Sequence, residues 1–244
     1  MTIIPVFQPQ FVILAAGVGS RLGMSYPKSL TILDNSETIM ARQIRNIHAA
    51  FGSNVDITIV VGFMLDSIIA AFPDEKFVYN DVYDRTNTSK SLLLALKHLD
   101  KKNNVVWMNG DVVFDEDLLF YFRNQIDSKN ASIITVSTAS VADEEVKYTI
   151  DSNGYINSLS KIIPIDLALG ESIGINYVSA ADRPSLERNL ATVNDNDYFE
   201  RGIELSISRD GHKYSPFDIT TLGISAIEVD FVEDLVKANA AIKI

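Results

Sequence analysis

Cysteine is absent from this 244-residue chain, which also has only three histidines and one tryptophan. Without cysteine the chain can form no disulfide and offers no thiolate to a metal ion. No apolar run reaches the roughly 18 residues that a membrane span needs. The start, residues 1–5, lacks the basic region and the long apolar core of a signal peptide. We therefore expect a cytoplasmic protein without a membrane partner.

Basic residues are also scarce, with 21 Lys and Arg against 32 Asp and Glu, so that the formal net charge is −11. Nonspecific binding of nucleic acid needs a basic face and is therefore disfavoured. An acidic protein can still bind a nucleotide where its few cations converge or a divalent metal intervenes. The three histidines show no metal-binding spacing, and no nucleophilic triad is evident.

Strand-like and helical patterns alternate through residue 138. This alternation predicts a mostly parallel sheet with helices on both faces, in a three-layer, Rossmann-like α/β/α arrangement. For the first helix, Ser36 can serve as N-cap and Gly52 ends it. The expected strands are 11–14, 55–61, 76–80, 104–109 and 131–138, and the expected helices are 36–51, 66–72, 88–99 and 116–126.

The pattern changes after residue 145. Two strand-like runs, 145–150 and 155–161, are joined by Asp151-Ser152-Asn153-Gly154 and predict a small β-hairpin. Further strands are expected at 173–179 and 225–229, and further helices at 180–190, 197–208 and 231–241. We expect one domain over 1–244, with halves of about 1–140 and 141–244. An exposed edge over 146–177 would suit a homodimer.

The loop after the first strand is rich in small residues and carries two cations. It reads Ala15-Ala16-Gly17-Val18-Gly19-Ser20-Arg21-Leu22-Gly23, and Pro27-Lys28 follows. Small residues let backbone N–H groups approach a phosphate chain, and Arg21 and Lys28 can neutralise it. The loop is neither a Walker A loop, which needs Gly-Lys-Ser/Thr, nor a Rossmann Gly-x-Gly-x-x-Gly loop. It predicts a polyphosphate site at the carboxyl end of the first strand.

Two acidic segments follow strands. Asn109-Gly110-Asp111 ends the expected strand 104–109, and Glu228-Val229-Asp230 precedes the last expected helix. Magnesium prefers one or two carboxylates together with phosphate oxygens and water. A metal site is one reading of Gly110-Asp111, and an ordinary turn after a strand is the other.

The first loop, with Leu14-Ala15-Ala16-Gly17-x-Gly19-Ser20-Arg21 and Pro27-Lys28, resembles the signature of the nucleotidylyltransferases that activate sugar phosphates and related phospho-metabolites. The short Arg-to-Lys spacing is similar to that of small bacterial CTP-dependent cytidylyltransferases of the phosphocholine, phosphoglutamine and aminoethylphosphonate type. The resemblance covers nearly the whole chain and implies the nucleotide-diphospho-sugar transferase-like fold, with the nucleotide bound by the half over 1–140.

The resemblance also implies roles for individual residues. The nucleotide would be bound by Leu14, Ala15, Ala16, Gly17, Gly19, Ser20 and Gly110. Asp111 and Asp230 would hold Mg²⁺, and Arg21 and Lys28 would stabilise the triphosphate. Lys161 would contact the phosphate of the acceptor.

The remaining candidates concern the base and the acceptor. Asn87 and Ser91 match an Asn-rich loop that similar cytidylyltransferases have, and such groups can bond a pyrimidine edge. Helix capping by Thr88 or Ser89 explains this loop as well. Glu171 matches a Gly-Glu pair in the family's acceptor wall. Tyr198 and Glu200 combine an aromatic ring and a carboxylate, which suits an ammonium group, although the amphipathic face of a helix explains them equally.

Together these motifs predict transfer of CMP from CTP to a small phosphorylated acceptor, such as phosphoglutamine or phosphocholine, with release of pyrophosphate. Such activated groups decorate bacterial surface and capsular polysaccharides. One alternative is UTP- or dTTP-dependent activation of a hexose 1-phosphate. Another, from a different class, is a catalytically dead subunit that senses nucleotides. Such subunits usually lose a metal carboxylate or a phosphate-binding cation, and this chain keeps both.

Overall fold

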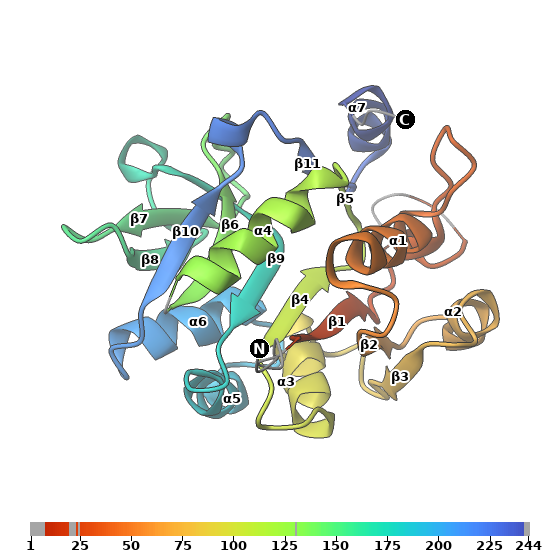
Figure 1. Cartoon of the computed structure of the whole chain (residues 1–244), viewed down its shortest axis with the longest axis horizontal. Helices are drawn as coiled ribbons and strands as arrows, with labels where there is room; N and C mark the ends of the chain where they lie inside the picture. The colour runs from red at the N-terminus through yellow and green to blue at the C-terminus, as the bar shows by residue number, and fades with distance from the viewer. Residues whose placement is uncertain (1–7, 20–22, 24, 130, 242–244) are drawn as a thin grey trace, which may run out of the picture.

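The alternation of strands and helices produces a large central sheet, which the computed structural model describes for residues 8–19, 23, 25–129 and 131–241. In this part of the chain nine strands form the sheet, and seven of them follow the order β10-β6-β9-β4-β1-β2-β3 (Figure 1). The nine strands are β1 (Gln10–Ala15), β2 (Ile57–Val61), β3 (Lys76–Tyr79), β4 (Val105–Asn109), β6 (Ser132–Ser137), β7 (Lys147–Ile150), β8 (Ile156–Ser160), β9 (Gly170–Val178) and β10 (Tyr214–Asp218).

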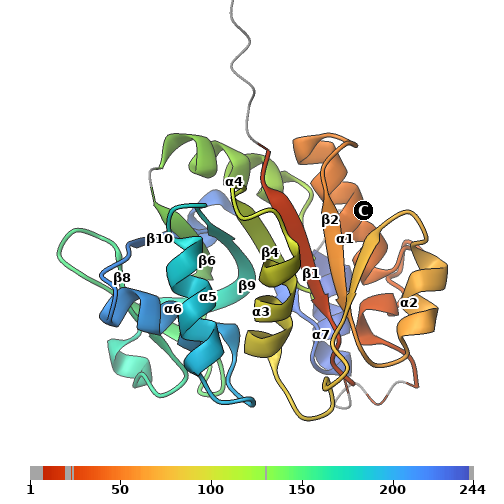
Figure 2. The same cartoon turned by 90° about the horizontal axis from the view of Figure 1, so that it is seen from below.

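Helices cover both faces of this sheet (Figure 2). One face packs against α1 and α4, and the other against α3, α5 and α6. The helices are α1 (Ile39–Phe51), α2 (Leu65–Ala71), α3 (Thr88–His98), α4 (Asp117–Ser128), α5 (Arg183–Thr192), α6 (Phe199–Ser208) and α7 (Val232–Ala241). None of the described helices is both long and apolar enough to cross a membrane. The predicted three-layer fold class is confirmed.

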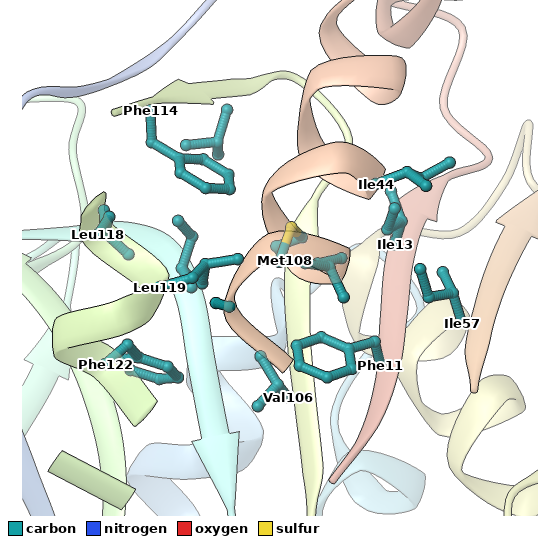
Figure 3. Close-up of a cluster of buried hydrophobic side chains, with 14 of the residues drawn as sticks. Phe11, Ile13, Ile44, Ile57, Val106, Met108, Phe114, Leu118, Leu119 and Phe122 are labelled. Carbon is teal, nitrogen blue, oxygen red and sulfur yellow. The ribbon is translucent and has the colours of Figure 1, made fainter. Parts of the chain in front are cut away.

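The core follows from the two-residue period of the buried strands. In β1, Phe11 and Ile13 face α1 and α4, whereas Val12 and Leu14 face the opposite helix layer. Figure 3 shows the first of these clusters, in which Met108 of β4 lies among side chains of α1 and α4. Because both faces of β1 are buried, its sequence from Phe11 to Ala15 is continuously apolar rather than alternating.

Three features of the large sheet and its first helix differ from the sequence prediction. β10 was not predicted, and it pairs with β6 in parallel. β9 begins at Gly170, earlier than expected, and runs antiparallel between β4 and β6. Ser36 as N-cap of α1 is wrong: the cap is Thr38, whose hydroxyl accepts from the Ala41 N–H, whereas Ser36 has a left-handed φ of 67° in the preceding turn. One interior strand of the sheet, β9, therefore comes from the second half of the chain.

A second, smaller sheet pairs a strand near the end of the chain with one that follows β4. It consists of β5 (Val112–Phe114), which was not predicted, and β11 (Ala226–Glu228), and the two strands are antiparallel. Val113 packs in a cluster with Val229 and with Ala238 of α7. The small sheet thereby fixes residues that follow β11 beside those that precede β5.

Candidate active site

The first loop and the acidic turn after β4 meet at one edge of the large sheet. β1 and β4 are parallel neighbours, so their carboxyl ends lie side by side. The Gly110 N–H donates to the Leu14 carbonyl at 2.9 Å. A Cβ atom added to Gly110 would lie 2.9 Å from that same oxygen, which is closer than Cβ atoms approach other atoms in proteins. Glycine at this position therefore allows the close approach that places Asp111 beside the loop.

Lys28 lies between the two carboxylates that were predicted to hold a metal. Its ammonium nitrogen donates to Asp111 Oδ2 at 2.7 Å and to Asp230 Oδ1 at 2.5 Å. Burial alone would lower the pKa of Lys28, but the charges and hydrogen bonds of Asp111 and Asp230 outweigh burial and hold that pKa above its ordinary value. The structure thus brings together one phosphate-binding candidate and both metal candidates.

The small sheet is what carries Asp230 to this position. Glu228 pairs with Val112 in the β5–β11 ladder, and the Val229 N–H donates to the Asp111 carbonyl at 3.0 Å. Asp230 comes directly after Val229, and it thereby lies near Asp111 although the two residues are 119 positions apart in the sequence. The two carboxylates converge because of backbone pairing, which also fixes their separation.

Gln43 holds the acidic turn from behind, and sequence reasoning did not single it out. Its side chain is 1% exposed, and its amide Nε2 donates to the carbonyls of Asn109 and Val112 at 2.9 and 2.8 Å. These two carbonyls flank Asp111. The sequence did contain a signal for Gln43: a polar side chain between Met40 and Ile47 lies on the apolar face of the helix, where it needs hydrogen-bond partners.

Glu228 is a second residue that was not assigned a role. It lies in the same cavity as Asp111, and Asn109 Nδ2 donates to its Oε1 at 3.2 Å. Burial raises the pKa of Glu228 well above its ordinary value, and the neighbouring charges of Asp111 and Glu200 raise it further. The sequence contained a signal for Glu228: it precedes Asp230 by two residues, and alternation along an extended segment puts two such side chains on the same face.

Lys28, Asp111, Glu228 and Asp230 line one cavity of about 1090 Å³, which is large enough for a nucleotide and a second small molecule. It contains most of the candidates from the sequence: Leu14, Ala15, Gly17, Gly19, Lys28, Asn87, Gly110, Asp111, Lys161, Glu171, Tyr198, Glu200 and Asp230. The structure therefore places candidates from both halves of the chain around a common space.

Four candidates are not among the described lining residues of the cavity. Ser20 and Arg21 lie outside the described residues. Ala16 is buried and is not part of the described cavity lining. Ser91 is also buried within α3, where its hydroxyl accepts from Asn80 Nδ2 at 3.1 Å, and it does not line the cavity either.

Asn87 lines the cavity and is also the N-cap of α3. Its side-chain oxygen accepts from the Thr88 N–H at 2.8 Å, and its Nδ2 donates to the Asn196 carbonyl at 3.3 Å. The predicted caps, Thr88 and Ser89, are therefore wrong: Asn87 caps α3, and this cap places its side chain at the cavity.

The second half of the chain supplies the other side of the cavity. Lys161 follows β8, and its ammonium nitrogen lies 4.4 Å from the ring centroid of Tyr198. Glu171 of β9 and Glu200 of α6 also line the space. Burial raises the pKa of Glu171 and raises that of Glu200 to about 7, the nearby Lys161 opposing the latter shift. This side of the cavity holds buried acidic groups near Lys161.

The raised pKa of Glu200 predicts a pH-dependent stability. Between its unfolded value of about 4.5 and its folded value of about 7 the native state binds the extra proton, so the free energy of unfolding falls as pH rises through this range. We expect Glu200→Gln to be more stable than the parent protein at pH 8, by about 3 kcal/mol at most. Near pH 4.5 the two should unfold alike. Urea unfolding at both pH values measures the difference.

A matched control for this prediction is Glu116→Gln, because the Glu116 side chain is 65% exposed and lies outside the cavity lining. Its stability should follow the same pH trend as that of the parent protein. The prediction would be contradicted if the free energy of unfolding of Glu200→Gln, relative to that of the parent protein, did not increase between pH 4.5 and pH 8.

The carboxylates fit a divalent cation of the magnesium type. Asp111 and Asp230 both bond one ammonium nitrogen, so an oxygen of each converges on a single point. Among the described residues, no group of three or more His, Cys, Asp or Glu side chains has a metal-binding arrangement. Two carboxylates with further oxygens from a phosphate and water are what Mg²⁺ needs, whereas zinc would need more protein ligands.

A family model describes the chain over residues 11–173, as a MobA-like NTP transferase domain. The chain belongs to the MobA-like NTP transferase family. This match confirms the family resemblance, and the nucleotidylyltransferase class of its activity follows from it. No curated protein sequence matches this MobA-like NTP transferase.

Solved structures share the fold of this MobA-like NTP transferase at low sequence identity. CTP:phosphocholine cytidylyltransferase from Streptococcus pneumoniae has a TM-score of 0.73 at 17% identity, covering 95% of this chain and 97% of that one. A candidate glucose-1-phosphate thymidylyltransferase from Bacillus anthracis has a TM-score of 0.76 at 15% identity, covering 95% and 94%. The inositol-1-phosphate CTP transferase from T. maritima has a TM-score of 0.73 at 14% identity, covering 98% and 99%. At such identities the likeness shows the fold.

Proposed function

We propose that this nucleotidylyltransferase moves CMP from CTP to a small phosphorylated acceptor, such as phosphoglutamine or phosphocholine, and releases pyrophosphate. The observation that carries the proposal is the meeting of Lys28, Asp111 and Asp230 in one cavity that also contains Lys161. Cations near a carboxylate pair suit a reaction between two phosphate-bearing molecules. The product class would serve the decoration of surface or capsular polysaccharide.

The reaction needs little covalent chemistry from the protein. A phosphate oxygen of the acceptor attacks the α-phosphorus of CTP, the bond from that phosphorus to the bridging oxygen of the β-phosphate breaks, and pyrophosphate leaves. The attacking oxygen is already anionic near pH 7, so no general base is required. The protein therefore contributes by positioning the two phosphates and by neutralising their charge.

Each charged group has a part in this positioning. The backbone N–H groups of the loop after β1 approach the triphosphate, and Lys28 and Arg21 neutralise it together with the leaving pyrophosphate. Lys161 holds the phosphate of the acceptor. Asp111 and Asp230 would hold Mg²⁺, which when bound neutralises phosphate oxygens and orients them.

Two features support CTP as the nucleotide. The spacing from Arg21 to Lys28 is short, as in cytidylyltransferases, and Asn87 lines the cavity. The Asn87 amide can form hydrogen bonds with the edge of a pyrimidine. The Ser91 hydroxyl accepts from Asn80, so that Ser91 would contribute to the base site only indirectly, by fixing the position of α3. UTP- or dTTP-dependent activation of a hexose 1-phosphate is the competing function, because an enzyme named for that chemistry has the same fold.

Pyrophosphate release tests the proposal. A panel crosses CTP, UTP, dTTP and ATP with phosphocholine, phosphoglutamine, O-phosphoethanolamine and glucose 1-phosphate, each with Mg²⁺. We expect turnover with CTP and an acceptor other than the hexose phosphate. Turnover only with UTP or dTTP and glucose 1-phosphate would establish the competing function. Thermal stabilisation by CTP without turnover on any acceptor would instead favour a nucleotide-sensing subunit.

A further inference from the structure

One side chain of α1 bridges the whole turn that carries Asp111. The amide nitrogen of Gln43 donates to the carbonyls of Asn109 and Val112, at 2.9 and 2.8 Å. Asn109 is the last residue of β4 and Val112 is the first residue of β5, so that these two contacts hold both ends of the turn. An amide has two N–H bonds, and this pair of contacts uses its full donor capacity. The backbone on either side of Asp111 is therefore fixed to α1.

Polar side chains of α1 also take the place of a strand beside β5. In the part of the chain that the structure describes, β5 pairs with β11 alone. The carbonyls of Val112 and Phe114 are bonded by α1 instead: Gln43 donates to the first and Arg42 Nε to the second, at 3.0 Å. Both side chains are nearly fully buried, and a buried carbonyl without a donor costs free energy. Of these two residues, only Gln43 also reaches the turn before β5.

The start of the same helix holds the segment that carries Lys28. Ile39, the first residue of α1, donates its N–H to the Thr31 carbonyl at 3.0 Å. The Thr31 N–H in turn donates to the Lys28 carbonyl, also at 3.0 Å. Leu30 packs against the hydrophobic cluster to which α1 contributes. The backbones at Lys28 and at Asp111 are thus both tied to α1 by short chains of hydrogen bonds.

One turn of α1 separates these two attachment points. Ile39 and Gln43 are four residues apart, which places them on the same side of the helix. A helix is a stiff spacer, because each turn is closed by backbone hydrogen bonds, and Figure 3 shows α1 packed on β1 and β4 through its apolar face. This spacer holds Lys28 and Asp111 where their side chains meet, with 2.7 Å between Nζ and Oδ2.

We propose that Gln43 is a positioning residue of this nucleotidylyltransferase, which keeps the Asp111 carboxylate in place to contact Lys28 and to hold a divalent cation. The inference rests on the proposed function, in which Asp111 binds the metal. Gln43 lies outside the described cavity lining, so it acts through the backbone of the turn and not on a substrate. Groups that orient metal ligands from behind typically contribute about 10- to 100-fold to metal affinity or activity.

Gln43→Met tests the assignment, because methionine has a similar volume and cannot donate a hydrogen bond. Binding of Mn²⁺ alone is measured from the electron paramagnetic resonance signal of free Mn²⁺, since oxygen ligands of the magnesium type also bind Mn²⁺. We expect the Kd for Mn²⁺ to rise about 10-fold. With CTP, Mg²⁺ and the acceptor that gives the fastest pyrophosphate release, kcat should fall about 10- to 100-fold. The KM for the acceptor should stay within about 3-fold, because Gln43 does not contact the side of the cavity that holds Lys161.

Asn46→Leu is the matched control on the same helix. Asn46 is a buried amide that also donates to β5, but its acceptor is the Phe114 carbonyl, at the end of the strand away from the turn. The variant should keep the parental Mn²⁺ affinity and kcat, whatever its effect on thermal stability. Gln43→Asn keeps the amide but is too short to reach both carbonyls, so it should weaken Mn²⁺ binding as well. It replaces Gln43→Met if that variant does not fold.

Equal Mn²⁺ affinities in the parent protein and in the Gln43 variants overturn the inference. A loss of affinity in Asn46→Leu as large as that in Gln43→Met overturns it too, because the effect would then follow from any weakened contact between α1 and β5. Absence of pyrophosphate release with every nucleotide and acceptor contradicts the proposed function, whereas the Mn²⁺ measurement still decides whether Gln43 positions the acidic turn.

Discussion

Asp111→Asn is expected to lower kcat/KM for pyrophosphate release by about 10²- to 10³-fold, the range seen when one preorganised electrostatic group is removed from an active site. The Asp111 carboxylate accepts from Lys28 and lies beside the loop after β1. The amide of asparagine keeps the shape of the side chain but loses its charge and one acceptor oxygen. The variant should fold normally, which circular dichroism and thermal melting can check.

Lys28→Ala should cause a loss of similar size, because it removes the cation that both carboxylates contact. Asp117→Asn is the matched control for the aspartate, since Asp117 is exposed in the first turn of α4 and lies outside the cavity lining. It should keep the parental rate. Near-parental rates in both Asp111→Asn and Lys28→Ala would sink the assignment of this site.

Arg183→Met is expected to lower the free energy of unfolding by about 3–5 kcal/mol, the cost of breaking a buried, hydrogen-bonded charge. Arg183 is 1% exposed at the start of α5. Its guanidinium donates to the Leu96 carbonyl, to the Asp100 carbonyl at 2.6 Å and to Glu187 Oε1 at 2.8 Å. The substitution leaves the carbonyls at the end of α3 without this donor and Glu187 without its partner. Urea unfolding measures the change.

Arg188→Met provides the comparison on the same helix. The Arg188 side chain is 66% exposed and its contact with Asp210 is 3.4 Å, so its loss should change stability by about 0.5 kcal/mol or less. A similar, small effect at Arg183 would mean that the carbonyls at the end of α3 find other donors. The difference between the two variants thus isolates the buried network from the general loss of a charge.

Local patterns in the sequence were sufficient for the fold class and for the first loop. The apolar runs of β1, β2 and β4 and the periodic helices between them predict a mostly parallel sheet, and such a sheet places loops after its strands at one edge. The small residues after β1 and the aspartate after β4 were therefore expected at the same edge. These inferences need only near neighbours in the chain and the two-residue and 3.6-residue periods.

What the sequence could not provide was pairing between distant segments. β5 has three residues and β10 contains a proline, so neither has a pattern that marks it as a strand, and only their partners β11 and β6 make them strands. The same holds for β9, whose interior, antiparallel position depends on the return of the chain from the hairpin. Short strands are stabilised by their neighbours, and strand propensity is a weak guide to them.

The sequence by itself predicted a phosphate-binding loop and two metal carboxylates, and it determined that they belong to one α/β fold. The tertiary structure alone decided that Lys28 contacts Asp111 and Asp230, from which it is separated by 83 and 202 residues. It alone decided that Gln43 holds the acidic turn. Local periodicity sets which face of an element is buried, whereas contacts at such sequence separations depend on strand pairing and packing across the whole molecule.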